Sequence, residues 1–377
     1  MTPLLHSCLS AFRSSFVRMS PGAPADLVVA QIAPRSGAVG AAGAMVAAGA
    51  SMGFDEANRT GGVHGRRIRH VMLDDGYDCA RSAQMARQLL DAPELPVAIL
   101  SFGTRNTLAV AAELAARGLH IPTLPSASGS SSLRTPFDRN LFHIRASYAS
   151  ELARLVQTLA KTSIRSMVLV CQDDEFGRDT EQTLRSHVAG TGLSLLRAIA
   201  HPRSQQDIAP LVATVRHSNA HAVLLATTAQ AATSFIQQAH RLDYRPLIAT
   251  ISDMDPHTLL EETGDAAKTV MLSQTVPDPR CTDIPLVAEF SRLAAASAGR
   301  VPCHVQALEG FMQARVVVEG LKRAARPDAG GLLRALETIH DLDLGGHRLS
   351  FSDGSHEGCA AVHVAVVTPS GRLIQYA

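Results

Sequence analysis

Residues 53–78 read GFDEANRTGGVHGRRIRHVMLDDGYD and join the end of one helix to a buried strand. The Gly-Gly pair at 61–62 is expected to end the helix, because glycine adopts the left-handed backbone conformation without a Cβ penalty. The apolar run within residues 68–73 has the length of a strand, and it stops at an Asp-Asp pair at 74–75. The stretch therefore predicts a helix, a tight turn and a strand that ends on two carboxylates.

The residues upstream complete a strand–helix–strand unit. Residues 26–32 (DLVVAQI) read as a second buried strand, and residues 36–43 form a turn of small residues that opens the helix. Such a unit predicts a right-handed crossover between parallel strands. The same alternation of strand and helix continues, with further strands expected at 97–100, 121–124, 167–171, 222–225 and 247–251. The sequence thus predicts an α/β protein with mostly parallel sheets and helices on both faces.

One ordered set of residues resembles the Leu/Ile/Val-binding family of type I periplasmic binding proteins. In that family a strand runs into a Ser-Gly turn, and a long helix then ends in N-x-x-GG-x-x-G before a strand and an Asp-Asp pair. The matching positions here are Ser36-Gly37, Asn58, Gly61-Gly62, Gly65 and Asp74-Asp75. The resemblance implies two lobes, each a mostly parallel sheet flanked by helices, with three crossings of the chain between them.

The resemblance also implies where the lobes divide. Crossings are expected near 145–148, 275–278 and 343–348. The expected lobes are residues 26–145 plus 278–345 and residues 146–277 plus 346–377. A strand is expected at 141–145 as the chain leaves the first lobe, and the C-terminal region is expected to hold antiparallel strands at 348–351 and 361–368, around turns at 353–354 and 370–371.

Three hydroxyl residues of the first lobe are candidates for holding a ligand. Thr104, Ser126 and Ser128 follow the expected carboxyl ends of two strands, which is where open α/β sheets bind ligands. Hydroxyl and backbone N–H groups at a helix N-terminus can receive a carboxylate. In the resembled family a small hydroxyl residue and a P-x-x-[ST] string hold the ligand carboxylate, and Thr104 and residues 125–128 match them. Ordinary helix capping and turn chemistry are the alternative.

The second lobe offers four more candidates. Phe176 matches a family position that is commonly aromatic and packs on the ligand, Thr228 and Asp253 follow strands, and Tyr148 lies at the first crossing. A carboxylate such as Asp253 is needed if the ligand carries an amine, because a desolvated ammonium must be paired. The alternative for Asp253 is a helix cap before the following proline. Ala42 departs from the aromatic residue that amino-acid receptors of the family often carry in the first turn.

Composition excludes several other classes of protein. The chain has 35 Lys and Arg against 34 Asp and Glu, a net charge of +1, so no nucleic-acid partner is indicated. Its 6 cysteines lack a C-x-x-C motif and its 16 histidines lack H-E-x-x-H, so no metal site is expected. No G-x-S-x-G motif is present either. No cofactor and no catalytic activity are therefore expected.

The N-terminal residues 1–25 have features of an export signal. A small-residue A-x-A site at 23–25 directly precedes the first strand, although Arg13 and Arg18 interrupt the apolar region that such a signal requires. The resemblance implies a periplasmic location. No segment reaches the roughly 18 consecutive apolar residues that a membrane-spanning helix needs.

The resemblance implies a solute receptor of an ABC importer, which closes on a small carboxylate-bearing ligand such as an amino acid and delivers it to membrane permease subunits. A ligand-sensing regulatory module of the same fold is one alternative. An NAD-dependent enzyme is another, suggested by the spacing of Gly37, Gly40 and Gly43. A dinucleotide site requires G-x-G-x-x-G and an acidic residue about 20 residues further on, whereas Asp74 lies 31 residues after Gly43 (74 − 43 = 31).

Overall fold

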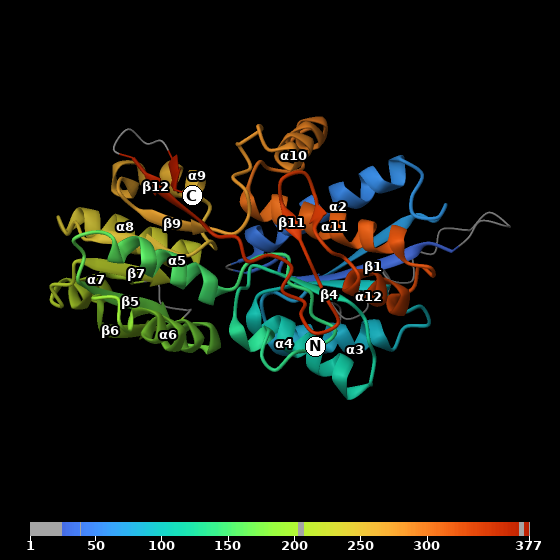
Figure 1. Cartoon of the computed structure of the whole chain (residues 1–377), viewed down its shortest axis with the longest axis horizontal. Coiled ribbons are helices and arrows are strands. Elements are labelled where there is room, and N and C mark those ends of the chain that lie inside the picture. Colours follow the sequence, from blue (N-terminus) through green and yellow to red (C-terminus); the bar gives the residue numbers. More distant parts are fainter. Residues whose placement is uncertain (1–24, 38, 203–206, 369–372, 377) are drawn as a thin grey trace, which may run out of the picture.

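The structure is a computed structural model that describes residues 25–37, 39–202, 207–368 and 373–376. It shows two α/β lobes side by side, with the chain passing between them (Figure 1). The predicted two-lobed α/β architecture is confirmed.

The first lobe is built on a four-stranded parallel sheet in the order β2-β1-β3-β4. Helices α3 and α4 cover one face of this sheet, while α2, α10, α11 and α12 lie on the other. The strands are β1 (Leu27–Ala33), β2 (Ile68–Asp74), β3 (Ala98–Phe102) and β4 (Thr123–Ser126). The helices are α2 (Gly40–Arg59), α3 (Cys79–Leu90), α4 (Thr104–Ala116), α10 (Pro285–Ala296), α11 (Val305–Arg323) and α12 (Ala329–Glu337).

The turn between α2 and β2 forms as the sequence predicts. Gly61 and Gly62 have φ values of +102° and +72°, which is the left-handed region that favours glycine. The Gly62 amide donates to the Ala57 carbonyl at 2.8 Å and closes the end of the helix. The Asn58 side chain then joins the helix to the strand, because its amide donates to the Ile68 carbonyl and its oxygen accepts from the Ile68 amide.

The second lobe contains a seven-stranded sheet in the order β13-β12-β9-β8-β7-β5-β6. Helices α5 and α6 cover one face, while α7, α8 and α9 cover the other. The strands are β5 (Ser166–Gln172), β6 (Ser194–His201), β7 (Ala222–Ala226), β8 (Leu247–Thr250), β9 (Met271–Gln274), β12 (His363–Val367) and β13 (Leu373–Tyr376). The helices are α5 (Tyr148–Ala160), α6 (Glu175–Val188), α7 (Ala209–Arg216), α8 (Ala229–Arg241) and α9 (Pro256–Thr263).

One local expectation near the lobe boundary is wrong. Residues 141–145 form no strand and make only isolated bridges, from Leu141 to β4 and from His143 to Glu357. The two expected C-terminal strands are present and antiparallel, and they belong to different sheets. β11 (Arg348–Leu349) pairs with β10 (Leu342–Asp343), while β12 pairs with β9 and β13.

The reason for this pairing is that the two C-terminal segments pack in different lobes. Leu349, Phe351 and Cys359 belong to the core of the first lobe, whereas Val364 belongs to that of the second. We therefore propose that the third crossing lies between Cys359 and His363, later than the range 343–348. The turn expected at 353–354 is bracketed by a bridge between Ser352 and Ser355, and the turn at 370–371 lies outside the described residues.

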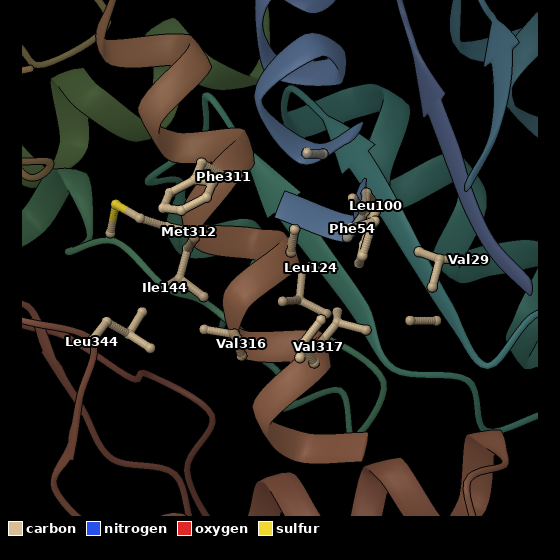
Figure 2. Packing of buried hydrophobic residues seen from close by; sticks show 14 of the residues in the cluster. Val29, Phe54, Leu100, Leu124, Ile144, Phe311, Met312, Val316, Val317 and Leu344 are labelled. Carbon is tan, nitrogen blue, oxygen red and sulfur yellow. The ribbon is translucent and has the colours of Figure 1, made fainter. Parts of the chain in front are cut away.

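The core of the first lobe is centred on α11, which packs beside α2 on one face of the sheet (Figure 2). Val317 of this helix lies beside Leu124 of β4, Phe54 of α2 lies beside Leu100 of β3, and Phe311 belongs to the same core. All five side chains are buried. This packing fixes α11 against the sheet, and α11 in turn supplies side chains to the cleft between the lobes.

Glycines allow α2 and α11 to approach closely. A Cβ on Gly49 would lie 1.8 Å from the Ala307 carbonyl oxygen, and a Cβ on Gly310 would lie 2.0 Å from the Val46 carbonyl oxygen. Both obstructing atoms belong to helix backbones, which cannot move aside as a flexible side chain does.

Replacing Gly310 with alanine should therefore lower the free energy of unfolding by about 1–3 kcal/mol, the usual result of overpacking a core. Chemical denaturation measures the change. Gly330→Ala is the matched control, because the nearest atom to its Cβ is Arg334 Nη1 at 3.4 Å. At that position alanine should be neutral or stabilising by up to about 1 kcal/mol. Equal effects of the two substitutions would contradict the close helix packing.

Candidate ligand-binding cleft

A cavity of about 90 Å³ lies between the two lobes. It is bounded by loops that follow the carboxyl ends of β1 and β3 in the first lobe and of β5, β7 and β8 in the second. Parallel strands bring these loops to one edge of each sheet, and open α/β sheets bind ligands at that edge. The lining residues are Val39, Ala42, Tyr77, Phe102, Thr104, Ala127, Tyr148, Gln172, Phe176, Thr227, Thr228, Ala229, Asp253 and Gln306.

The structure brings five of the seven sequence-predicted site residues to this cavity. These five come from both lobes and are Thr104, Tyr148, Phe176, Thr228 and Asp253. Whether they contact a ligand stays a prediction.

The two predicted serines lie behind the lining of the cavity. The Ser126 hydroxyl donates to the Ser101 carbonyl of the neighbouring strand at 3.0 Å and is completely buried. Ser128 Oγ lies 2.8 Å from Thr104 Oγ1. Ser128 is therefore placed to orient the Thr104 hydroxyl.

Several helices of both lobes begin at the cavity, and two of them lack a side-chain cap. Val39 precedes α2 and Gly103 precedes α4, and neither position has a side chain that accepts from the first turn of its helix. Uncapped N-terminal N–H groups together with the helix dipole favour an anionic group. Gly103 is required here, because its φ is +75° and a Cβ would lie 2.7 Å from the Tyr77 ring. By contrast, the Thr228 hydroxyl caps α8 by accepting from the Ala231 amide.

Aromatic rings form part of the wall in each lobe. Tyr77 and Phe102 of the first lobe meet edge to face at 5.9 Å between ring centroids, and Tyr148 and Phe176 of the second lie 4.9 Å apart. Ala42 also lines the cavity and leaves space where a larger side chain would fill it. The cavity thus combines apolar walls with a small number of polar groups, as is usual for small-molecule sites.

A buried ionic cluster adjoins the cavity at Asp253. Arg145 Nη2 lies 3.4 Å from Asp253 Oδ1 and 3.6 Å from Glu151 Oε1, while Arg145 Nη1 lies 3.6 Å from Glu309 Oε1. Tyr148 donates its hydroxyl to Asp253 Oδ2 at 3.0 Å. We call Arg145, Glu151, Asp253 and Glu309 the Arg145 cluster.

Hydroxyl and amide groups donate hydrogen bonds to the carboxylates of the Arg145 cluster. Glu151 accepts from the Ser252 amide, the Ser252 hydroxyl and the Ser273 hydroxyl. Glu309 accepts from the Ala127 amide at 3.3 Å. These bonds come from both lobes, so the cluster joins the first crossing to α11 and to the second-lobe sheet.

Burial has opposite effects on the acids and on the base of this cluster. It raises the pKa of Glu151, Asp253 and Glu309, and the nearby guanidinium only partly opposes that rise. Burial also acts to lower the pKa of Arg145, but Glu309, Asp253 and Glu151 outweigh it and keep that pKa raised. One guanidinium faces three carboxyl groups, so the cluster can hold a proton or attract a ligand cation.

Sequence reasoning identified Asp253 but missed Arg145, Glu151 and Glu309. One usable signal was present, since Arg145 ends the otherwise apolar run LFHIR at the expected first crossing. The suggestion that Asp253 caps the next helix is wrong. Asp255 caps α9 instead, by accepting from the amides of His257 and Thr258.

Two absences hold for the described part of the chain. Among those residues, no group of three or more His, Cys, Asp and Glu is placed to hold a metal ion. Over the same residues, every helix is too short or too polar to span a lipid bilayer.

Two lobes that enclose a small cavity at their strand ends define a solute-binding protein of the two-lobed α/β type. A family model described as periplasmic binding protein matches residues 27–372, and the chain belongs to this family.

Three relatives illustrate the similarity. The Leu/Ile/Val-binding protein homolog 7 of Brucella melitensis biotype 1 is 22% identical over 373 residues, which cover 93% of this chain and 91% of that protein. A substrate-binding periplasmic protein from Ralstonia solanacearum is 30% identical with a TM-score of 0.87, and the match covers 93% of this chain and 100% of that one. A branched-chain amino acid ABC transporter protein from Thermus thermophilus with bound valine has a TM-score of 0.85 at 19% identity, covering 94% and 96% of the two chains. The last similarity shows the fold alone.

The raised pKa of Glu309 predicts a pH dependence of stability. A carboxyl group with a raised pKa in the folded state stabilises the protein below its unfolded pKa, and that contribution is lost as the pH rises through the folded pKa. Glu309→Gln removes this group, so the free energy of unfolding should fall less steeply with rising pH than in the unchanged protein. Chemical denaturation at several pH values above 4 measures the slope.

Glu319→Gln is the matched control for this experiment. Glu319 lies on the same helix but pairs at the surface with Lys322 and Arg323. This variant should keep the slope of the unchanged protein. The same slope in both variants would show that Glu309 is not the source of the pH dependence.

Proposed function

We propose that this chain is the solute-binding receptor of an ABC importer and closes on a small ligand that carries a carboxylate, such as an amino acid. The observation that carries the proposal is the cavity between the lobes, lined by Thr104 on one side and by Phe176 and Asp253 on the other. A ligand that contacts both lobes at once stabilises the closed arrangement, and hinge bending at the crossings opens it again.

The polar groups of the cavity suit a ligand that carries a negative group at one end and a positive group at the other. The Thr104 hydroxyl and the uncapped start of α4 suit a carboxylate. Asp253 lies at the acidic Arg145 cluster and suits an ammonium group, because a buried ammonium needs a carboxylate partner. A zwitterionic amino acid carries both groups.

The family membership supports the rest of the proposal. The Thermus protein of the same fold is described as a branched-chain amino acid ABC transporter with bound valine. We propose by analogy that this chain acts in the periplasm, delivers its ligand to membrane permease subunits and catalyses no reaction. The dinucleotide alternative is disfavoured, because Asp74 accepts from the backbone amides of Arg35 and Gly76 and so serves the turn after β2.

A thermal-shift screen tests the ligand class directly. Amino acids, aromatic acids, short dicarboxylates and NAD would be added separately, since a ligand at 100 times its dissociation constant stabilises a protein by about 2.7 kcal/mol. A rise in melting temperature with one carboxylate class is the expected result. A rise with NAD alone would contradict the proposal.

Thr104→Ala should weaken binding of the identified carboxylate by about 1.5–3 kcal/mol, the usual contribution of a hydrogen bond to a charged group. Isothermal titration calorimetry measures the change. Adding Ser128→Ala should lower the affinity little further, because Ser128 acts through the Thr104 hydroxyl. Thr158→Ala is the control, since Thr158 donates only to its own helix. Unchanged affinity in the folded Thr104 variant would remove this residue from the site.

Asp253→Asn should reduce the affinity for ligands with an ammonium group more than that for analogues without one. Asparagine keeps an oxygen for the Tyr148 hydroxyl but loses the charge that pairs with an ammonium. The measurement is the affinity ratio between an amino acid and its deaminated analogue, which should fall by about tenfold or more. An unchanged ratio would show that Asp253 does not bind the amine.

A further inference from the structure

A second contact between the lobes lies outside the ligand cavity. The Asp179 side chain of α6 meets the short helix η1 (Ser131–Leu133) of the first lobe. Asp179 Oδ2 accepts from the Ser130 hydroxyl and from the Ser131 amide, each at 2.8 Å. Asp179 Oδ1 accepts from the Ser131 hydroxyl. A single carboxylate therefore receives three donors.

The donors and the acceptor belong to different folding units. Leu133 at the end of η1 packs with Ala111 of α4 and with Leu141, all in the first lobe. On α6, Phe176 and Leu184 pack in the core of the second lobe. The contact between Asp179 and η1 is therefore made only while these parts of the two lobes are in contact.

The contact can break without leaving buried groups unpaired. Ser131 is exposed and Asp179 is half-buried, so water can replace these two partners when the lobes separate, whereas Ser130 is buried. Ser130 Oγ also has Ser132 Oγ as a neighbour at 2.9 Å. Water can therefore replace these hydrogen bonds at a small cost in free energy, as is needed for a contact that forms and breaks repeatedly.

We propose that Asp179 is a closure latch, a positioning residue that stabilises the closed arrangement of the lobes without touching the ligand. This inference rests on the proposed function. Asp179, Ser130 and Ser131 do not line the cavity. The latch therefore changes the equilibrium between open and closed forms, and it does not change which ligand is recognised.

A latch of this kind has a distinctive effect on affinity. The apparent dissociation constant rises in inverse proportion to the population of the binding-competent state. A contact that acts only on this population changes the affinity for every ligand by the same factor. A residue that touches the ligand, such as Asp253, changes the affinity for some ligands more than for others.

Asp179→Ala in the full chain should weaken binding by about 10- to 100-fold, because charge-assisted hydrogen bonds are lost. The factor should be the same for each ligand found in the thermal-shift screen, and surface plasmon resonance measures it. Ser131→Ala, on the other lobe, should weaken binding in the same uniform way. The double variant should lose less than the two separate losses combined, because the two residues contact each other.

Glu181→Ala is the matched control. Glu181 lies on the same helix and carries the same charge, but it pairs with Arg185 of its own helix. Its affinities should equal those of the unchanged protein. Unchanged affinities in folded Asp179→Ala, or losses that differ between ligands, would overturn the latch.

A cross-linking experiment tests the latch without any ligand. Ser131→Cys combined with Asp179→Cys should be joined by a short bismaleimide, as mapped by mass spectrometry. Ser131→Cys combined with Glu181→Cys is the control and should be joined far less, because two residues along a helix turn the side chain by about 200°.

The two experiments separate failure of the latch from failure of the proposed function. If no ligand raises the melting temperature, the proposed function fails, while the cross-link still decides whether the two lobes meet at Asp179. A missing cross-link would overturn the latch even if a carboxylate ligand binds.

Discussion

The arrangement of the cleft depends on the buried guanidinium of Arg145 at the first crossing. It faces Glu151 and Asp253 from the second lobe and Glu309 from the first. Removing one partner from a buried ion pair usually destabilises a protein by several kcal/mol, because the remaining charge is then unpaired. In this arrangement of the lobes the crossing contacts both α11 of the first lobe and groups of the second lobe. Asp253, which pairs with Arg145, also lines the cavity.

A second buried carboxylate, that of Asp255, joins helices of the two lobes. One oxygen of Asp255 accepts from the first amides of α9 in the second lobe, and the other accepts from the Val305 amide at the start of α11 in the first. A carboxylate between two helix N-termini is favoured by both helix dipoles. The Arg145 and Asp255 contacts are thus buried, whereas the Asp179 contact lies nearer the surface. Under the proposed function, opening of the cleft breaks the Asp179 contact.

The sequence predicted those features that depend on local patterns. Glycine at 61–62 and the run 68–73 determine a turn and a strand from neighbouring residues alone, and both were found. The partners of the C-terminal strands could not be predicted, because β12 pairs with β9, about 90 residues earlier in the chain. Partners at such separations are chosen by the packing of whole lobes. Local spacing carries no information about that choice.

The candidate site also combines features that local sequence predicts with features that it does not. Thr104, Phe176 and Asp253, each of which follows a strand, were predicted as site residues, and the structure places all three at one cavity. The carboxyl ends of parallel strands lie at one edge of a sheet. The spacing could not show that Ser126 turns its hydroxyl to a neighbouring strand.

The distribution of charge around the cavity also could not be predicted from the sequence and is seen only in the structure. The uncapped start of α4 lies in the first lobe, while the excess of carboxyl groups of the Arg145 cluster reaches the cavity through Asp253 of the second. The two sides therefore differ in electrostatic character, positive at the helix end and negative at the cluster. A ligand with charges of both signs gains from both sides only when the lobes close around it. Under the proposed function, selectivity for the ligand and closure of the cleft thus depend on the same arrangement of charges.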